Sequence, residues 1–429
     1  MATRKPGSFT ASWAEADMEE TQLVTDRPIR ILTFSSLYPN AAQPVNGVFV
    51  ENRLRHLVAS GAVEARVVAP VPWFPSSHPR FGSWARFASA PVFEERHGLK
   101  VWHPRYPVLP KVGMTVAPTL MYLWTRSLVR TLAADMDFDL IDAHYFYPDG
   151  VAAAMIARDL GKPLVITARG TDINLIPRYA LPRAQILRAA ARADGLITVC
   201  DALKQAMAGL GVSPDRIQVL RNGVDLTTFR PGDRDEARRE LGLSGRVLAS
   251  VGLLIERKGH HLVIDALARI PDTTLVIAGG GPDRRELENR ARTAGVADRV
   301  RFLGEIPHHT LPSVYRAADA LVLASSREGW ANVLLESMAC GTPVVASDVW
   351  GTREVIGDSE AGILVAERTA DALTEGISRL FTALPDRAAT RRYAEQFDWD
   401  ATTRGQCELF SRIVANRRST RRILQPAGA

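Results

Sequence analysis

Two glutamates eight positions apart, Glu328 and Glu336, stand in the stretch SREGWANVLLESMACGTPVVAS. If the residues between them are helical, a rise of about 1.5 Å per residue separates the two carboxylates by roughly 12 Å along the axis. That separation suits a ligand with a hydroxyl-rich group at each end and phosphate between them. A nucleotide sugar has this shape. The alternative is that Glu336 is a solvated helix residue and Glu328 a loop charge.

The surrounding residues predict an α/β unit that would position this pair. Residues 330–340 are good helix formers, and Gly341 followed by Pro343 ends the predicted helix. The apolar runs ADALVLASS and PVVAS, on either side, are typical of buried parallel strands. Glu328 is therefore expected in a strand-to-helix loop, where α/β sheets bind ligands and a helix N-terminus attracts an anion.

Two further loops repeat this arrangement. Gly252 ends the run RVLASVG, and the basic pair Arg257 and Lys258 precedes the next helix, where it could neutralise phosphate or be an ordinary surface pair. Gly281 ends the strand LVIAGGG before another helix. Neither loop is a dinucleotide fingerprint or a G-x-x-x-x-G-K-[ST] phosphate loop. The prediction is that several helix N-termini and glycine loops converge on one cleft.

Length and composition exclude several classes of protein. A chain of 429 residues, 46% hydrophobic and 23% charged, predicts two or three soluble globular domains. No run approaches the roughly 20 apolar residues of a membrane span, and the first residues lack the apolar region of a secretory signal. The three cysteines have neither disulfide nor metal-ligand spacing, which favours a reducing cytoplasm.

The net charge of +6 indicates an anionic partner. The basic residues are dispersed and no recognition-helix or stacking motif accompanies them, so nucleic acid is not expected. A phosphate-bearing substrate or an anionic membrane surface remains, and the stretch RHGLKVWHPRYPVLPKVG is the predicted membrane contact. The alternative is that the basic excess serves only solubility.

Strands and helices alternate in two successive series, the first ending near residue 211 and the second beginning at RVLASV. Two series of similar size predict two doubly wound, Rossmann-like α/β domains facing each other across a cleft. The predicted parts are a disordered leader at 1–27, an amino-terminal acceptor-side domain at 28–215, a carboxy-terminal nucleotide-sugar-binding domain at 216–395, a helix at 396–416 and a basic tail at 417–429.

Five motifs then occur in a fixed order: VLRNGVDLTTFRP, VGLLIERKG, LVIAGGGPDRREL, RVRFLGEIP and REGWANVLLESMACGTPVVASDVWGTREVI. Together they resemble the family 4 glycosyltransferases of GT-B fold, over nearly the whole chain and most specifically from about 219 to 356. In the amino-terminal half, YPNAAQPVNGVFV, DAHYFYPDG and TARGTDI are similar to the branch that builds bacterial surface polysaccharides of teichuronic acid or exopolysaccharide type.

The resemblance implies a role for each candidate residue. Glu336 would bind the ribose diol of the donor, Glu328 the hydroxyls of the transferred sugar, and Lys258 the diphosphate. His144, after an amino-domain strand, matches the cleft histidine of the family, although it could instead bond only neighbouring backbone. The other implied contacts with the donor are Gly47 from the facing domain, Gly252, Arg257, Gly281, Ile306 near the base, Trp330, Ala331, Asn332 and Val333.

The reaction implied by the resemblance is a retaining transfer without a metal or other cofactor. The donor would be a UDP- or GDP-sugar, and the acceptor a growing glycan on a lipid carrier. A helix dipole and basic side chains can stabilise the departing diphosphate in place of a cation. The protein would work in the cytoplasm, held peripherally at the inner face of the cell membrane.

Some positions depart from the family pattern. Leu253 stands where many members have arginine, and Arg169 where many have histidine, so Arg169 is predicted to compensate for the missing charge. Trp350 and Ala331 replace glycines. These departures leave two other functions open. One is a catalytically weak nucleotide-sugar-binding partner in a polysaccharide assembly complex, and the other is a hydrolase or epimerase of nucleotide sugars.

Overall fold

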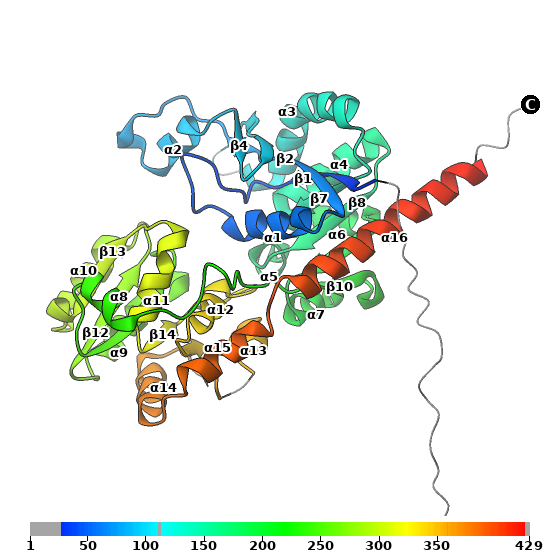
Figure 1. Ribbon diagram of the computed structural model, residues 1–429. Coiled ribbons are helices and arrows are strands. Elements are labelled where there is room, and N and C mark those ends of the chain that lie inside the picture. Colours follow the sequence, from blue (N-terminus) through cyan, green and yellow to red (C-terminus); the bar gives the residue numbers. More distant parts are fainter. Residues whose placement is uncertain (1–26, 110–112, 358, 425–429) are drawn as a thin grey trace, which may run out of the picture.

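The computed structural model describes residues 27–109, 113–357 and 359–424, which form two α/β domains (Figure 1). The predicted leader at 1–27 lies outside the described residues apart from Arg27, as does the end of the predicted tail, 425–429. Within the described ranges, no helix combines the length and the apolar content needed to cross a membrane.

The amino-terminal domain is built on an eight-stranded sheet of order β10-β9-β8-β7-β1-β2-β5-β4. Every pairing in it is parallel except that of β4 with β5. This arrangement confirms the predicted parallel α/β class. The strands are β1 (Ile29–Phe34), β2 (Val63–Val68), β4 (Phe93–Arg96), β5 (Leu99–Trp102), β7 (Leu140–His144), β8 (Leu164–Ala168), β9 (Gly195–Thr198) and β10 (Ile217–Val219), with β3 (Val71–Pro72) and β6 (Arg105–Tyr106) forming a separate pair.

Helices cover both faces of this sheet, because successive strand residues point to opposite sides. In β1, Ile29 and Ile31 pack in a core with residues of α1 and α16, whereas Leu32 and Phe34 pack with α3 and α4. The helices of this half are α1 (Val48–Ala59), α2 (Ser83–Ser89), α3 (Gly113–Met136), α4 (Val151–Leu160), α5 (Thr171–Asn174), α6 (Ala180–Arg192) and α7 (Asp201–Gly209); α16 (Asp400–Leu424) comes from the end of the chain.

The carboxy-terminal domain has a six-stranded parallel sheet of order β13-β12-β11-β14-β15-β16. This is the doubly wound order, whose switch point lies between β11 and β14 and opens a crevice for a ligand. The strands are β11 (Arg246–Val251), β12 (Thr273–Ala278), β13 (Val300–Gly304), β14 (Ala320–Leu323), β15 (Val344–Ser347) and β16 (Gly362–Val365), and the helices are α8 (Arg234–Glu240), α9 (His260–Leu267), α10 (Arg284–Thr293), α11 (Leu311–Ala317), α12 (Asn332–Ala339), α13 (Thr352–Val355), α14 (Ala370–Thr382) and α15 (Arg387–Glu395).

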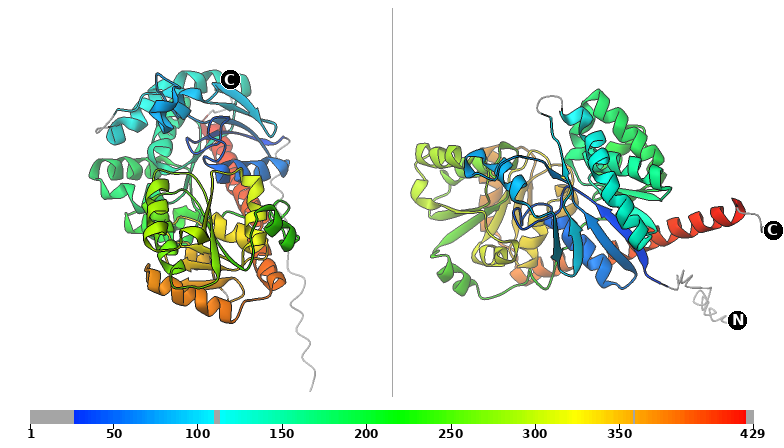
Figure 2. Two further views of the ribbon diagram at one scale, coloured as in Figure 1. Left: turned by 90° about the vertical axis from the view of Figure 1, so that its left-hand side faces the viewer. Right: turned by 90° about the horizontal axis from the view of Figure 1, so that it is seen from above.

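The boundary between the domains differs from the prediction. Strand β10 pairs with β9, so the amino-terminal sheet continues past the predicted end at residue 215. The predicted helix at 396–416 is α16, which extends through the first part of the predicted tail. Its apolar face, which includes Leu409, Phe410 and Ile413, is buried against the amino-terminal sheet. The last helix therefore belongs structurally to the first domain (Figure 1 and Figure 2).

The chain consequently crosses between the domains twice, at residues 220–225 and 397–399. The two crossings touch, because Val224 N–H donates to the Phe397 carbonyl at 2.8 Å. A Cβ added to Gly223 would lie 2.6 Å from the Asp398 carbonyl carbon, so a side chain there would push the two segments apart. The crossings thus form one double-stranded connection between the domains.

Candidate functional site between the domains

A cleft lies between the two domains and next to the double connection. Its walls include Val48 and Phe49 of α1, Asp225 of the first crossing, and the carboxy-domain residues Ile306, His308, Asn332, Val333 and Glu336. Four of the predicted ligand contacts, Ile306, Asn332, Val333 and Glu336, therefore line one cavity. Residues from both domains close it.

Glu336 lies inside α12, where it is almost fully buried and has two side-chain partners. The Tyr315 hydroxyl, from α11, donates to Oε2 at 2.9 Å. On the cleft side, His308 Nε2 lies 2.8 Å from Oε1. Burial lowers the pKa of His308, but Glu336 outweighs that effect and the net pKa is raised above its ordinary value. His308 was not predicted, although it stands only two positions beyond Ile306.

Glu328 lies in the loop between β14 and α12, and its side chain is also buried. Lys258 Nζ donates to its Oε1 at 2.6 Å, Ser325 Oγ donates to the same oxygen at 2.7 Å, and Arg257 lies 3.7 Å from Oε2. Burial would raise the pKa of Glu328, but the charges of Lys258 and Arg257 prevail and the pKa is lowered. The carboxyl group is therefore ionised at neutral pH.

Lys258 reaches Glu328 because of the glycine that follows it. The short 3-10 turn Glu256–Lys258 ends at Gly259, whose φ of 73° is left-handed. An added Cβ at Gly259 would clash with the Ala324 carbonyl, so the turn packs directly on the end of β14. The basic pair predicted at this loop is therefore brought to the carboxyl end of β14 by backbone contact.

The predicted glycines Gly252 and Gly281 have different surroundings. A Cβ at Gly252 would lie 3.5 Å from the Lys258 side chain, which is an ordinary van der Waals contact. A Cβ at Gly281 would contact the backbone of Leu254, at 2.7 Å from its nitrogen, so this glycine lets two loops pack together. Leu253, where the resemblance expects arginine, is 54% exposed.

The helix between the two glutamates begins later than predicted. It starts at Asn332 rather than at Trp330, and Trp330 and Ala331 are buried just before it. Ala331 occupies the N-cap position and makes no side-chain capping bond. The Asn332 and Leu334 amides donate to the carbonyls of Trp330 and Ala331, at 3.1 and 3.0 Å, so the attraction of this N-terminus for an anion rests mainly on the helix dipole.

Gly47 from the amino-terminal domain sits at the N-terminus of α1, with a left-handed φ of 69°. A Cβ there would clash with the Leu37 backbone, so only glycine allows the β1–α1 loop to fold back this tightly. Asn46 Nδ2 braces the loop by donating to the carbonyls of Ser36 and Tyr38, at 3.2 and 3.3 Å.

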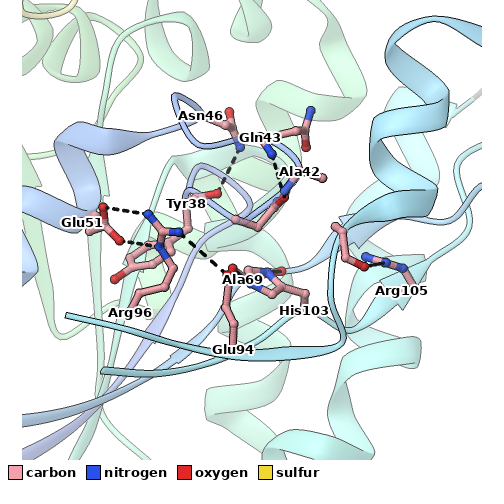
Figure 3. A network of polar contacts seen from close by, with 12 residues as sticks. Tyr38, Ala42, Gln43, Asn46, Glu51, Ala69, Glu94, Arg96, His103 and Arg105 are labelled. Atoms are coloured by element: carbon pink, nitrogen blue, oxygen red, sulfur yellow. Dashed lines mark hydrogen bonds and ion pairs between the residues drawn. The ribbon is translucent and has the colours of Figure 1, made fainter. Parts of the chain in front are cut away.

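An ionic network beneath this loop holds α1 in place (Figure 3). Arg96 Nε donates to Glu51 of α1 at 2.7 Å, and Arg96 also lies 3.8 Å from Glu94. His103 Nε2 is 2.9 Å from Glu94, and its Nδ1 is 3.2 Å from the Ala69 carbonyl. Strand β4 and the residue that follows β5 thereby hold α1, whose N-cap is Gly47.

His144, predicted as a cleft histidine, is fully buried and has two side-chain partners. Its Nε2 lies 3.0 Å from Asp142 Oδ2, and Arg169 Nη2 lies 2.6 Å from its Nδ1. Since a guanidinium only donates, Nδ1 accepts and Nε2 carries the proton that is donated to Asp142. Burial, reinforced by Arg169, lowers the pKa of His144 to about 4, so the imidazole is neutral.

Arg169 was predicted to supply the charge missing at the diphosphate, but its guanidinium is bonded to other side chains. Its Nη1 donates to Asn222 Oδ1 at 2.9 Å, and Nη2 is taken by His144. Asn222 in turn donates to Asn332 Oδ1 at 3.2 Å. The guanidinium therefore joins the amino-domain wall to the first crossing and, through it, to the start of α12.

The same network extends to residues that the sequence analysis missed. Gln406 of α16 donates to Asp142 Oδ2 at 3.2 Å and accepts from Arg53 Nε at 2.8 Å. Arg53 also donates to the Leu220 carbonyl at 3.0 Å. No local pattern could have found this set, because Arg53 and Gln406 are 353 positions apart.

The domains also touch directly across the cleft. A Cβ on Gly329 would clash with the Arg169 carbonyl, so the loop before α12 lies against the loop after β8. Glu354 of α13 accepts from the backbone amides of Asp201 and Ala202, at 3.0 and 2.9 Å, and from Arg221 Nη2 at 2.7 Å. Its carboxylate thus caps α7 of the facing domain.

Comparisons with protein families match both halves of the chain. Residues 47–228 match the model described as Glycosyltransferase Family 4, and residues 233–397 match the model described as Glycosyl transferases group 1. TuaC of Bacillus subtilis, named as a teichuronic acid biosynthesis glycosyltransferase, is 29% identical over 82% of this chain and 89% of its own length. A D-inositol 3-phosphate glycosyltransferase of Actinosynnema mirum is 34% identical over 73% of this chain and 82% of its own.

Solved structures with the same architecture cover almost the entire chain. A sucrose-phosphate synthase from Thermosynechococcus elongatus superposes with a TM-score of 0.73, at 22% identity, over 91% of this chain and all of that one. HepE of Anabaena, solved in complex with UDP, gives a TM-score of 0.67 at 21% identity, over 90% of this chain and 99% of that one.

Proposed function

This chain belongs to the family 4 glycosyltransferases, with their GT-B fold as expected from its motifs, and we propose that it moves a sugar from a nucleotide-diphosphate sugar to a growing glycan with retention of anomeric configuration. One observation carries the proposal. Two buried carboxylates, Glu328 and Glu336, lie on either side of the N-terminus of α12: Glu328 is paired with Lys258, and Glu336, which lines the interdomain cavity, is paired with His308. Support for the donor class comes from the UDP found in the structurally similar HepE.

The proposed roles follow the order of groups in such a donor. Glu336 accepts hydrogen bonds from the ribose, and Glu328 accepts them from the transferred sugar. The diphosphate lies between them, against the α12 amides and Lys258. An ammonium group has three donors, so Lys258 can keep its bond to Glu328 while it also binds phosphate oxygen. Gly47 brings the facing backbone close to the same phosphates.

The reaction needs a group that stabilises charge on the departing diphosphate. Lys258, Arg257 and the α12 N-terminus provide positive potential on one side of the cleft. We therefore propose catalysis without a metal ion or other cofactor. Activity that is lost with EDTA and restored by Mg²⁺ or Mn²⁺ would contradict this part of the proposal.

Binding and product analysis together test the function. Thermal unfolding with UDP, GDP and ADP identifies the nucleotide, because a ligand that binds the folded state raises the unfolding temperature. The corresponding nucleotide sugar is then incubated with and without a membrane extract that contains glycan acceptors, and the products are separated. Transfer that requires the acceptor supports the proposal, whereas no stabilisation by any nucleotide contradicts it.

A binding partner without turnover is the second candidate, and the contacts of Arg169 favour it. Because that guanidinium is committed to His144 and Asn222, it does not replace the charge missing at Leu253. Stabilisation by a nucleotide sugar without any product would identify this function. Sugar release that does not need an acceptor would instead identify a hydrolase.

For the acceptor we propose a lipid-linked glycan, met at an anionic membrane surface. The basic stretch that led to the membrane prediction supplies less free charge than its sequence suggests. Arg96 is paired with Glu51, Arg105 donates to the Ala90 carbonyl, and His103 is buried. The neighbouring surface instead exposes two tryptophans, Trp73 and Trp84.

Sedimentation with vesicles tests the membrane proposal. Binding to anionic vesicles at low salt, and release as salt is added, are expected, since each basic residue near such a surface contributes about 1 kcal/mol. Trp84→Ser should weaken binding, whereas Trp124→Ser, on exposed α3, is the matched control. Absence of binding at low salt contradicts the proposal.

A further inference from the structure

His308 is a titratable residue in the cleft to which no role has yet been given. It lies in the 3-10 turn His308–Thr310 between β13 and α11, and its side chain is 28% exposed. Its ring packs edge-on against Phe229, with 5.1 Å between ring centroids. Both residues line the cavity that contains Glu336. The imidazole therefore lies at the cavity wall beside Glu336, the carboxylate proposed to bind ribose.

The two oxygens of Glu336 differ in what a ligand can reach. Oε2 is held by Tyr315, whose side chain is fully buried and cannot withdraw without opening the core. Oε1 is held by His308, which is partly exposed at the cavity wall. A hydroxyl arriving from the cleft therefore competes with His308 for Oε1.

The charged groups around His308 favour its protonated form in the empty site. Glu336 of α12 is the nearest, and Asp225 of the first crossing and Glu51 of α1 act in the same direction. Tyr315 of α11 also approaches Glu336, and burial raises its pKa well above the ordinary value, so it stays neutral. Burial of His308 works against protonation, yet its pKa is raised overall.

We propose that His308 is a proton-linked gate on the ribose subsite: a ribose hydroxyl displaces the His308 N–H from Glu336, and the freed imidazole releases its proton to solvent. The inference rests on the proposed binding of a nucleotide sugar, and it assigns a specificity-determining residue to that site. The only covalent change is the transfer of one proton from the imidazolium nitrogen to water or buffer, while the ribose hydroxyl takes over the hydrogen bond that the imidazolium gave.

The direction of the pH effect follows from proton release. If the ribose hydroxyl takes over the bond to Glu336, the imidazolium loses a hydrogen bond that stabilised it, so the pKa of His308 is lower in the complex than in the free protein. Binding then releases a proton, and affinity rises with pH until His308 is neutral in the free protein. A single coupled proton changes the affinity by at most about tenfold per pH unit.

Titration calorimetry with UDP between pH 5.5 and 8.5 tests the gate on the full chain. The terminal phosphate of UDP itself titrates in this range, so the measured quantity is the ratio of the wild-type dissociation constant to that of His308→Gln at each pH. The expected result is a ratio that falls at least threefold, roughly, from the lowest to the highest pH. Buffers of different ionisation enthalpy should show more protons released by wild type than by the variant.

Tyr315→Phe is the matched control, because it removes the other hydrogen bond to Glu336 without removing a group that titrates in this range. The ratio of the wild-type dissociation constant for UDP to that of Tyr315→Phe should be independent of pH. A constant ratio for His308→Gln, or one that rises with pH, overturns the gate even if UDP binds. If UDP, GDP and ADP all fail to bind wild type at millimolar concentration, the proposed function itself fails, and the gate with it.

Discussion

The charged side chains on the two sides of the cleft differ in how far they are exposed to solvent. On the carboxy-terminal side, each buried glutamate is paired with a partly exposed side chain: those of Lys258 and His308 are 14% and 28% exposed. On the amino-terminal wall, Asp142 and His144 are almost completely buried and bonded to each other. Arg53 is equally enclosed.

This difference separates groups that a ligand can engage from groups that hold the site together. A ligand entering the cleft can take over hydrogen bonds from Lys258 or His308 without opening the core. It cannot do so with Asp142, which is fully buried and whose hydrogen-bond partners are His144 of the same strand, β7, and Gln406 of α16. The hydrogen bonds of the carboxy-terminal wall can thus pass to a ligand, whereas those of the amino-terminal wall stay within the protein.

The largest effect is expected from removing the charge at the centre of the amino-terminal wall. Asp142→Asn leaves Arg53 and Arg169 buried without their shared counter-charge, and breaking a buried pair costs about 3 to 5 kcal/mol. Denaturant unfolding measures the loss. Asp137→Asn, which removes an exposed pair with Lys162, is the control and should cost almost nothing. Equal losses of unfolding free energy for the two variants would show that the buried charge of Asp142 contributes no more to stability than the exposed one of Asp137.

The next effect concerns turnover. Lys258→Ala removes a donor where negative charge develops on the diphosphate, and a loss of about 2 to 4 kcal/mol in transition-state stabilisation is expected. The ratio kcat/KM with the identified donor measures it. Glu256→Gln, in the same turn but largely exposed, is the control. A near-normal kcat for Lys258→Ala would move the phosphate contact to Arg257.

A smaller effect should be seen in nucleotide affinity. Glu336→Gln replaces a charged acceptor with a neutral one, and a charge-assisted hydrogen bond to ribose is worth about 1.5 to 3 kcal/mol. Calorimetry with the bound nucleoside diphosphate gives the change directly. Glu328→Gln is the informative comparison, since it should depress turnover more than nucleotide affinity. If Glu336→Gln leaves the nucleotide affinity unchanged, Glu336 does not bind the ribose.

The smallest effect is expected where the two walls meet. Glu354→Gln weakens the cap that Glu354 places on α7, and loss of a helix N-cap costs about 1 kcal/mol. The thermal unfolding temperature should fall slightly. Arg353→Gln, which removes only an exposed pair with Asp348, should leave it unchanged. A fall as large as that of Asp142→Asn would mean that the contact between the domains is as rigid as either wall.

The sequence predicted the elements that carry Glu328, Glu336 and Lys258 better than it predicted the contacts of the amino-terminal candidates. Glu328, Glu336 and Lys258 follow strands or stand in a helix whose boundaries are set by neighbouring residues, so local patterns place them. The parallel sheets were predictable for the same reason.

Long-range contacts were not predictable in this way. The pairing of Arg53 with Gln406 depends on α16 returning to the first domain, which no nearby residue signals. The pairing of β10 with β9 was missed because a three-residue strand gives no local sign of the sheet that it joins. His308 was missed because its partner, Glu336, lies 28 positions away and meets it only in the folded domain. The contacts of Arg169 likewise depend on Asn222, which belongs to neither domain's sheet.

The return of α16 sets a rule for anyone who recombines this protein with its relatives. Exchanging the carboxy-terminal domain alone requires two cuts, one in each crossing, with the segment from Asp400 to Leu424 kept with its original amino-terminal domain. A hybrid joined at a single point would pair a foreign helix with the Asp142 cluster, and Arg53 would lose the glutamine it needs. In this structure the carboxy-terminal domain is therefore inserted within the amino-terminal domain, rather than joined to its end.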